Sequence, residues 1–212
     1  MLSFMRKLIF RDCKTGDVIV KVYVVRHGET EYNKNKVYFG WTDICLNEKG
    51  RCQCAALKKE LNGIEFDEIL ASPAMRAAET AKIITDRQPI KTDHRFRELN
   101  FGEWEGLHYW DIEKKYPLEW KAWGNDWQHY CIPGGECFMD FYERVRTAWN
   151  EMKKHYVRQK KTKNILLAVH GGTLKVIILI EKNLPIKDYW KIECPLGSYH
   201  VFKIEQPCFC II

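Results

Sequence analysis

The sequence has no apolar run long enough to cross a bilayer, and charged residues interrupt the apolar positions near its start. A membrane-spanning helix needs about 20 apolar residues in succession, so we expect no membrane association. A secretory signal needs a continuous apolar stretch of roughly 7–15 residues, which the charged residues between positions 6 and 12 break up. The 9 cysteines are therefore expected to be free thiols in the cytoplasm, where disulfides are rare.

Metal-ligand spacing is also missing from the sequence. Cys52 and Cys54, like Cys208 and Cys210, are separated by a single residue, whereas zinc sites typically space their cysteines by about two to four residues. No histidine-rich segment accompanies either pair. We therefore expect neither a metal site nor a cofactor.

The formal net charge of +6 at pH 7 is compatible with an anionic partner. The lysines are scattered, however, apart from a short run at Lys160, Lys161 and Lys163. Segments that bind nucleic acid carry longer blocks of like charge. We expect a solvated positive surface and no nucleic-acid partner.

Short apolar runs alternate with segments of helical periodicity, and no internal repeat or low-complexity linker separates them, which predicts an α/β fold. The expected strands cover residues 18–25, 69–71, 164–169 and 199–204. The expected helices cover residues 47–61, 73–84, 136–158 and 171–180, with shorter helical pieces between residues 109 and 127. The 212 residues are 46% hydrophobic, enough for one core, so we expect a single domain over residues 18–212. Residues 1–17 form an N-terminal extension without an assigned role.

Two of the expected strands end in a histidine followed by glycine. The strand at 18–25 continues into Arg26-His27-Gly28, and the strand at 164–169 continues into His170-Gly171-Gly172. Ligands of open α/β sheets bind at the carboxyl ends of the strands, and a glycine lets the backbone approach an anion closely. A single histidine in this position is typical of an ordinary buried side chain, whereas two of them indicate a shared pocket.

Arginine extends this pattern to a third strand. Arg76 follows the strand at 69–71 and falls in the first turn of the next expected helix. The planar guanidinium binds phosphate oxygens in a bidentate way that lysine cannot. Together with Arg26 it would make a cationic pocket for a phosphate dianion, unless Arg76 is a surface residue paired with Glu79 or Glu98.

Three acidic residues follow in the segment 97–106, at Glu98, Glu103 and Glu105. A carboxylate repels a phosphate, so its presence in such a pocket needs a chemical reason. Donating a proton to the leaving oxygen is one such reason. The pattern itself does not distinguish among the three carboxyls.

These blocks resemble the histidine phosphatase superfamily, the phosphoglycerate-mutase-like proteins. The run 26–30, with Asn33 and Gly40-Trp41, is similar to the family signature, and residues 72–80, Glu98 and 170–172 match its other blocks in order. The resemblance extends from about Lys21 to Phe202. It implies a three-layer α/β/α sandwich with a mostly parallel sheet, and a metal-independent phosphatase that hydrolyses a small phosphorylated metabolite through a phosphohistidine.

The resemblance also implies a role for each residue of the pocket. His27 would be the residue that is phosphorylated, and Glu98 the acid and base. His170, in its protonated form, would help the arginines to stabilise the phosphate. The implied substrate contacts are Arg26, Asn33, Gly40, Arg76, His170 and Gly171.

The segment 103–135 bears on which reaction the pocket performs. In a 2,3-bisphosphoglycerate-dependent phosphoglycerate mutase, the resemblance implies extra basic residues here, including an adjacent arginine pair. This segment has Lys114, Lys115 and Lys121 but no arginine, which favours a phosphatase. A non-catalytic module that only binds a phosphorylated ligand would have no use for Glu98.

The same segment is rich in tryptophan, which either stacks on a flat substrate or packs the segment onto the sheet. The residues are Trp104, Trp110, Trp120, Trp123 and Trp127. The runs 101–106 and 133–136 are similar to the α-ribazole phosphatase branch of cobalamin assembly, whose substrate carries a flat benzimidazole. Broad-specificity sugar and nucleotide phosphatases share these features and remain an alternative.

Overall fold

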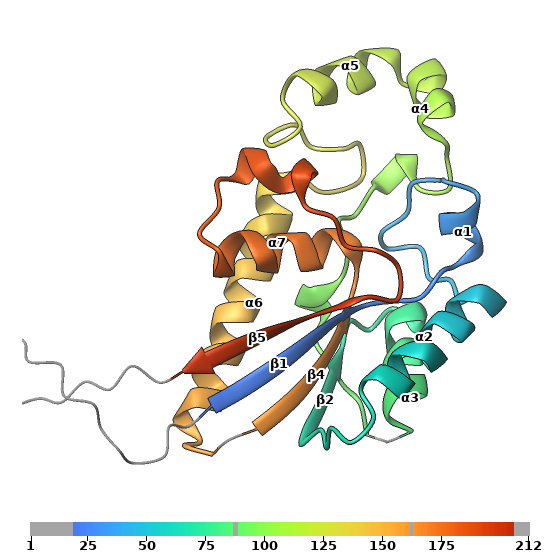
Figure 1. Cartoon of the computed structure of the whole chain (residues 1–212). Coiled ribbons are helices and arrows are strands. Elements are labelled where there is room, and N and C mark those ends of the chain that lie inside the picture. The colour runs from blue at the N-terminus through green and yellow to red at the C-terminus, as the bar shows by residue number, and fades with distance from the viewer. Residues whose placement is uncertain (1–18, 87–88, 162, 206–212) are drawn as a thin grey trace, which may run out of the picture.

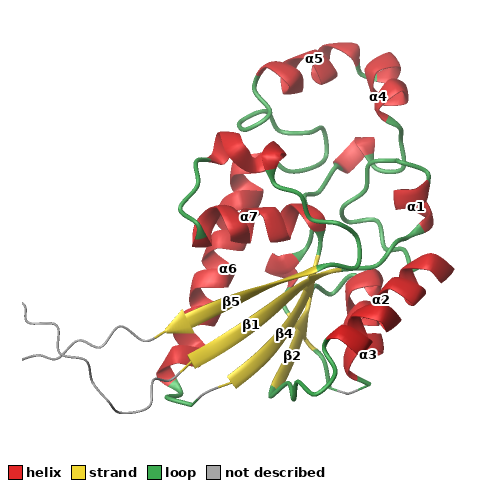
Figure 2. Cartoon of the chain, viewed as in Figure 1, coloured by secondary structure: helices red, strands yellow, loops and turns green. Residues whose placement is uncertain are grey.

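The computed structural model describes residues 19–86, 89–161 and 163–205, in which one five-stranded sheet lies between two layers of helices (Figures 1 and 2). The strand order is β3-β2-β4-β1-β5. The strands are β1 (Ile19–Arg26), β2 (Glu68–Ala71), β3 (Lys91–Thr92), β4 (Lys163–Val169) and β5 (Tyr199–Glu205). Only β5 pairs antiparallel with its neighbour. The expected three-layer α/β/α fold with a mostly parallel sheet is confirmed.

The helices lie close to the ranges expected from periodicity. The α-helices are α1 (Glu31–Lys34), α2 (Glu48–Glu60), α3 (Met75–Thr85), α4 (Tyr109–Lys115), α5 (Pro117–Asn125), α6 (Phe138–Arg158) and α7 (Gly171–Glu181). Three 3₁₀ helices are η1 (His94–Phe96), η2 (Gly102–Trp104) and η3 (Ile186–Lys191). The sequence did not predict β3 and η3, since both are too short for a periodicity to emerge. The expected extension at residues 1–17 lies outside the described residues.

Alternate residues of β1 pack into two separate hydrophobic layers. Val20, Val22 and Val24 belong to the layer built with α6 and α7, whereas Tyr23 and Val25 pack with α2 and α3. Successive side chains of a strand point to opposite faces, and a parallel sheet covered on both faces is apolar throughout. This explains why the strand appears in the sequence as an apolar run that only Lys21 interrupts before Arg26.

The register of the central strands determines which loops meet. Arg26 is the β1 partner of Val169 in β4, and Ala71 of β2 is the partner of Ala168. The residues that follow these three strands therefore emerge side by side at one edge of the sheet. The segment with α4 and α5 arches over the same edge (Figure 1).

The cysteines do not all follow the sequence-based expectation. A disulfide joins Cys131 to Cys137, so the expectation of free thiols is wrong for this pair. The free cysteines among the described residues are Cys45, Cys52, Cys54 and Cys194. No helix in the described part of the chain is long and apolar enough to cross a membrane.

Candidate active site

The two strand-end histidines lie against each other. The His27 backbone N–H donates to Val169 O at 3.0 Å, and the ring centroids of His27 and His170 are 5.2 Å apart. Both rings are buried. His27 Nδ1 lies 2.7 Å from Gly28 O, and since a carbonyl only accepts, Nδ1 carries the proton. Nε2 of His27 is therefore the ring nitrogen with a free lone pair.

Electrostatics keeps both rings neutral. Burial and then the charge of Arg76 lower the pKa of His27 well below its ordinary value, and Arg26 lowers this pKa further. The same two leading causes lower the pKa of His170. The low pKa of His170 disagrees with the expectation of a protonated ring, because burial and then the charge of Arg76 disfavour the protonated form.

Arg76 is a buried residue rather than a surface one. It lies in the first turn of α3, where Nη1 donates to Thr42 O at 3.0 Å and Nη2 to Gly40 O at 2.6 Å. Burial lowers its pKa to about 10, so the guanidinium remains charged at neutral pH. Glu79, one of the alternative partners, pairs with Arg51 instead.

Arg26 is fixed by the backbone of a distant loop and by a glycine. Its Nη1 donates to Cys194 O. A Cβ at Gly171 would lie 3.0 Å from both Cζ and Nε of Arg26, so the absence of a side chain there makes room for the guanidinium. Gly40 has a similar function, since it accepts from Arg76 and a Cβ there would overlap Leu99 O. Both glycines therefore support the arginines.

A cavity of about 180 Å³ opens between these residues and the segment above the sheet. Its polar lining is Arg26, His27, Asn33, Arg76 and Glu98. Its apolar lining is Leu99 with Tyr38, Phe39, Phe101, Trp123, Trp127, Phe138, Tyr189 and Trp190. The cavity thus combines a cationic floor with aromatic walls.

Three buried nitrogens at this site have no hydrogen-bond partner among the described residues. They are Nε of Arg26, Nε of Arg76 and Nδ1 of His170. Buried donors without a partner cost folding free energy, on the order of 1–3 kcal/mol each. The oxygens of a phosphate are acceptors of the kind that would satisfy such donors.

The Glu98 carboxyl group is held from two sides. Its Oε2 accepts the backbone N–H of Gly172 at 2.7 Å, and its Oε1 accepts that of Leu99 at 3.0 Å. A Cβ at Gly172 would lie 2.3 Å from Oε1, which explains why the second glycine after His170 has no side chain. Glu98 therefore reaches the cavity from the loop that follows η1.

The other two acidic candidates lie elsewhere. Both carboxylate oxygens of Glu105 accept hydrogen bonds from the loop 40–42, including the backbone N–H of Gly40 at 3.1 Å. Glu105 thereby fixes the loop whose carbonyls hold Arg76. Glu103 is exposed. Of the three carboxyls that the sequence left open, Glu98 is the one that lines the cavity.

Some tryptophans of the segment 103–135 pack against other residues, and others line the cavity. Trp104 is fully buried in the core, and Trp110 stacks on His108 with ring centroids 4.2 Å apart. Trp123 and Trp127 line the cavity, as does Trp190 of η3. Trp190 was not among the residues expected from the sequence, although the adjacent aromatic pair Tyr189-Trp190 was a usable signal.

The sequence matches the histidine phosphatase superfamily (branch 1) over residues 22–211. This chain belongs to the histidine phosphatase superfamily. The match covers the two strand-end histidines, both arginines and Glu98. Together with the phosphatases among its relatives, the match shows that the chain is a phosphatase.

Known relatives of this histidine phosphatase differ in their substrates. The adenosylcobalamin/α-ribazole phosphatase of Escherichia coli is 31% identical, over 88% of this chain and 91% of that protein. Phosphoserine phosphatase 1 of Hydrogenobacter thermophilus is 27% identical, over 89% and 88%. The crystal structure of the α-ribazole phosphatase from Shigella flexneri superposes with a TM-score of 0.79, at 27% identity and over 88% and 94% of the two chains.

Proposed function

We propose that this histidine phosphatase hydrolyses phosphate monoesters through a phosphohistidine at His27. The observation that carries the proposal is the state of His27: a buried, neutral ring whose Nδ1–H donates to Gly28 O, beside two fixed arginines. An unprotonated nitrogen is what a histidine nucleophile needs. The test is the isolation of a phosphoenzyme whose label maps to His27.

In the first step His27 Nε2 attacks phosphorus, and the bond from phosphorus to the ester oxygen breaks. Arg26 and Arg76 stabilise the charge on the phosphoryl oxygens. His170 contributes a neutral donor: its Nε2 lies 2.8 Å from Ser72 Oγ, and when that hydroxyl donates to Nε2, the proton of the ring is on Nδ1. Glu98, protonated at this stage, gives its proton to the departing alkoxide.

In the second step water attacks phosphorus and the bond to His27 Nε2 breaks. Glu98, now a carboxylate, takes the proton that water loses. Inorganic phosphate leaves, and both His27 and Glu98 return to their starting protonation. The arginines supply the positive charge in each step, so the proposed reaction needs no metal ion.

We expect hydrolysis to survive EDTA and to be inhibited by vanadate. The arginines take the place of a metal Lewis acid, and the described residues hold no cluster of three potential metal ligands. Vanadate adopts the five-coordinate geometry of phosphorus under attack. Steady-state rates with and without each reagent are the measurement. Loss of activity in EDTA that a divalent ion restores would refute the metal-free chemistry.

For the substrate we propose α-ribazole 5′-phosphate. The support is the sequence similarity to α-ribazole phosphatases together with the aromatic cavity walls, which suit a flat leaving group. Lys114, Lys115 and Lys121 are exposed and do not line the cavity. None of these three lysines is therefore placed to hold a second phosphate in the cavity, which a mutase would need.

If the aromatic walls bind the base, kcat/KM for α-ribazole 5′-phosphate will exceed that for ribose 5-phosphate. Stacking contributes roughly 1–3 kcal/mol per base, which corresponds to a factor of about 10 to 100 in affinity. Trp123→Ala and Trp127→Ala should reduce this preference. Trp110→Ala is the matched control, because Trp110 packs on His108. Equal kcat/KM for both esters in the wild type would refute the substrate assignment and leave the phosphohistidine chemistry standing.

A further inference from the structure

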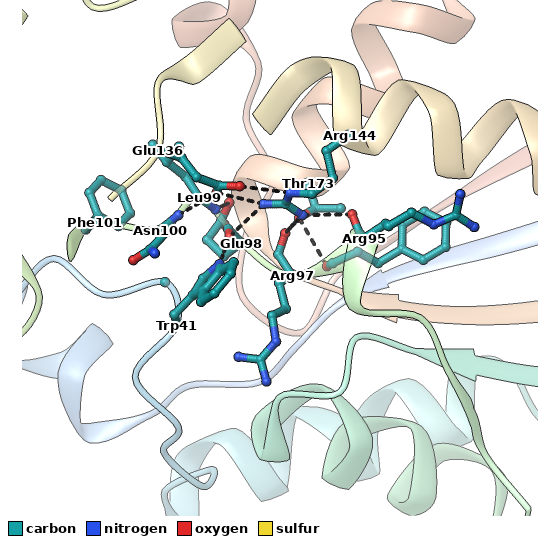
Figure 3. Close-up of polar contacts among 12 residues, drawn as sticks. Trp41, Arg95, Arg97, Glu98, Leu99, Asn100, Phe101, Glu136, Arg144 and Thr173 are labelled. Atoms are coloured by element: carbon teal, nitrogen blue, oxygen red, sulfur yellow. Dashed lines mark hydrogen bonds and ion pairs between the residues drawn. The ribbon is translucent and has the colours of Figure 1, made fainter. Parts of the chain in front are cut away.

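Arg144 of α6 divides its guanidinium between the segment that carries Glu98 and the carboxylate of Glu136. Its Nη1 donates to Arg95 O at 2.8 Å and to Arg97 O at 3.1 Å, and its Nη2 donates to Glu98 O at 3.3 Å. The remaining bonds go to Glu136, from Nε to Oε1 at 2.9 Å and from Nη2 to Oε2 at 2.8 Å. An arginine has five N–H donors, and all of them are occupied (Figure 3).

Glu136 fastens the other end of the same loop. Its Oε2 also accepts the backbone N–H of Asn100 at 2.9 Å, and its own N–H donates to Asn100 O at 3.0 Å. The Cys131–Cys137 disulfide closes the turn on which Glu136 lies. The ion pair between Arg144 and Glu136 is largely shielded from solvent, with side-chain exposures of 16% and 18%.

The loop needs such partners because it has no regular secondary structure after η1. Side chains donate to its carbonyls instead: Thr173 Oγ1 of α7 donates to Arg97 O at 3.3 Å, and Trp41 Nε1 donates to Glu98 O at 3.1 Å. Arg144 does so from the side of α6, whereas Gly172 and Leu99 hold the carboxyl group of Glu98 itself. Figure 3 shows the Arg144 guanidinium lying between Glu136 and the carbonyls of the loop.

We propose that Arg144 and Glu136 are positioning residues that place Glu98 for proton transfer. Neither side chain lines the cavity, so both act through the backbone of the loop. A general acid must lie within hydrogen-bonding distance of the oxygen it protonates, and displacement by about 1 Å can cost roughly 100-fold in rate. The inference rests on the proposed role of Glu98 as the acid.

Removing either positioning residue should slow the reaction at the step in which the leaving group is protonated. For Arg144→Ala and Glu136→Gln we expect kcat/KM with ribose 5-phosphate to fall roughly 10- to 100-fold, and with p-nitrophenyl phosphate by less than about threefold. An alkoxide needs a proton to depart, whereas nitrophenolate does not. Glu136→Gln keeps the shape of the side chain and one acceptor oxygen, so it serves as the variant least disturbing to the fold.

Arg146→Ala is the matched control. Arg146 also lies on α6 and pairs with Glu143, but both of these side chains are about half exposed. Surface ion pairs contribute little to stability, so the control should leave both kcat/KM values unchanged. Circular dichroism and thermal unfolding of all variants separate a misplaced loop from a misfolded chain.

Glu98→Gln separates failure of this inference from failure of the proposed chemistry. If Glu98→Gln is selective for ribose 5-phosphate and the Arg144 and Glu136 variants share that selectivity, the positioning role is supported. It is further supported if Arg144→Ala adds no selectivity in the Glu98→Gln background. If Glu98→Gln is selective but the other variants lose both substrates equally, the pair has only a structural role. If Glu98→Gln itself is not selective, the acid role fails and the inference fails with it.

Discussion

Replacing His27 with alanine should reduce turnover by at least about 10⁴-fold, the scale seen when the nucleophile of a covalent mechanism is removed. His170, the neighbouring ring, does not take its place, since its Nε2 lies 2.8 Å from Ser72 Oγ and its Nδ1 carries the proton when that hydroxyl donates to Nε2. His27 forms one side-chain hydrogen bond, to Gly28 O, so the variant should remain folded. Steady-state kinetics and thermal unfolding measure the two effects.

His94→Ala is the control for this experiment. The His94 side chain is 82% exposed and lies on η1, away from the cavity, so its removal should leave turnover unchanged. A folded His27→Ala protein with wild-type activity would contradict the phosphohistidine mechanism outright.

Replacing Glu98 with glutamine should separate two classes of substrate. General acid catalysis contributes about 10²–10⁴-fold, so kcat/KM for ribose 5-phosphate should fall by a factor in this range. The value for p-nitrophenyl phosphate should fall much less, because nitrophenolate departs without a proton. The ratio kcat/KM is the proper quantity, since it includes phosphorylation of His27 but excludes the later attack of water.

Glu103→Gln provides the comparison for Glu98→Gln. Glu103 is exposed, and its amide variant should behave as the wild type with both substrates. Equal losses with both substrates in Glu98→Gln would show that Glu98 does not protonate the leaving group.

Much of this fold was predictable because its signals are local. The apolar runs at β1 and β4 mark a sheet buried on both faces, and Asn47 caps α2 by accepting from Gly50 N, as its position before the helix suggests. His27 and His170 could be assigned to one pocket because parallel strands have their carboxyl ends on the same side of the sheet. The site residues His27, Arg26, Arg76 and His170 follow from these strand ends, and the structure brings them together.

The remainder depends on contacts between distant positions. Nothing in the sequence near Arg144 indicates that its partners are the carbonyls of a loop 46 to 49 residues earlier. Glu98 could be distinguished from Glu105 only once the structure showed that backbone N–H groups of the loop 40–42 donate to the Glu105 carboxylate. Trp190 reaches the cavity from η3, a short helix with no periodicity to reveal it. Hydrogen bonds between residues so far apart in the sequence can be recognised only in the three-dimensional structure.

The most direct test of the phosphohistidine is a rapid quench of the enzyme with ³²P-labelled p-nitrophenyl phosphate. The Glu98→Gln variant suits it, since this variant should be phosphorylated by a good leaving group and then lack the base that activates water. Quenching in alkaline detergent should trap label on the protein, stable in base and lost in acid, on the peptide that contains His27. An enzyme that turns over without trapped label, or with label on another residue, would contradict the central claim.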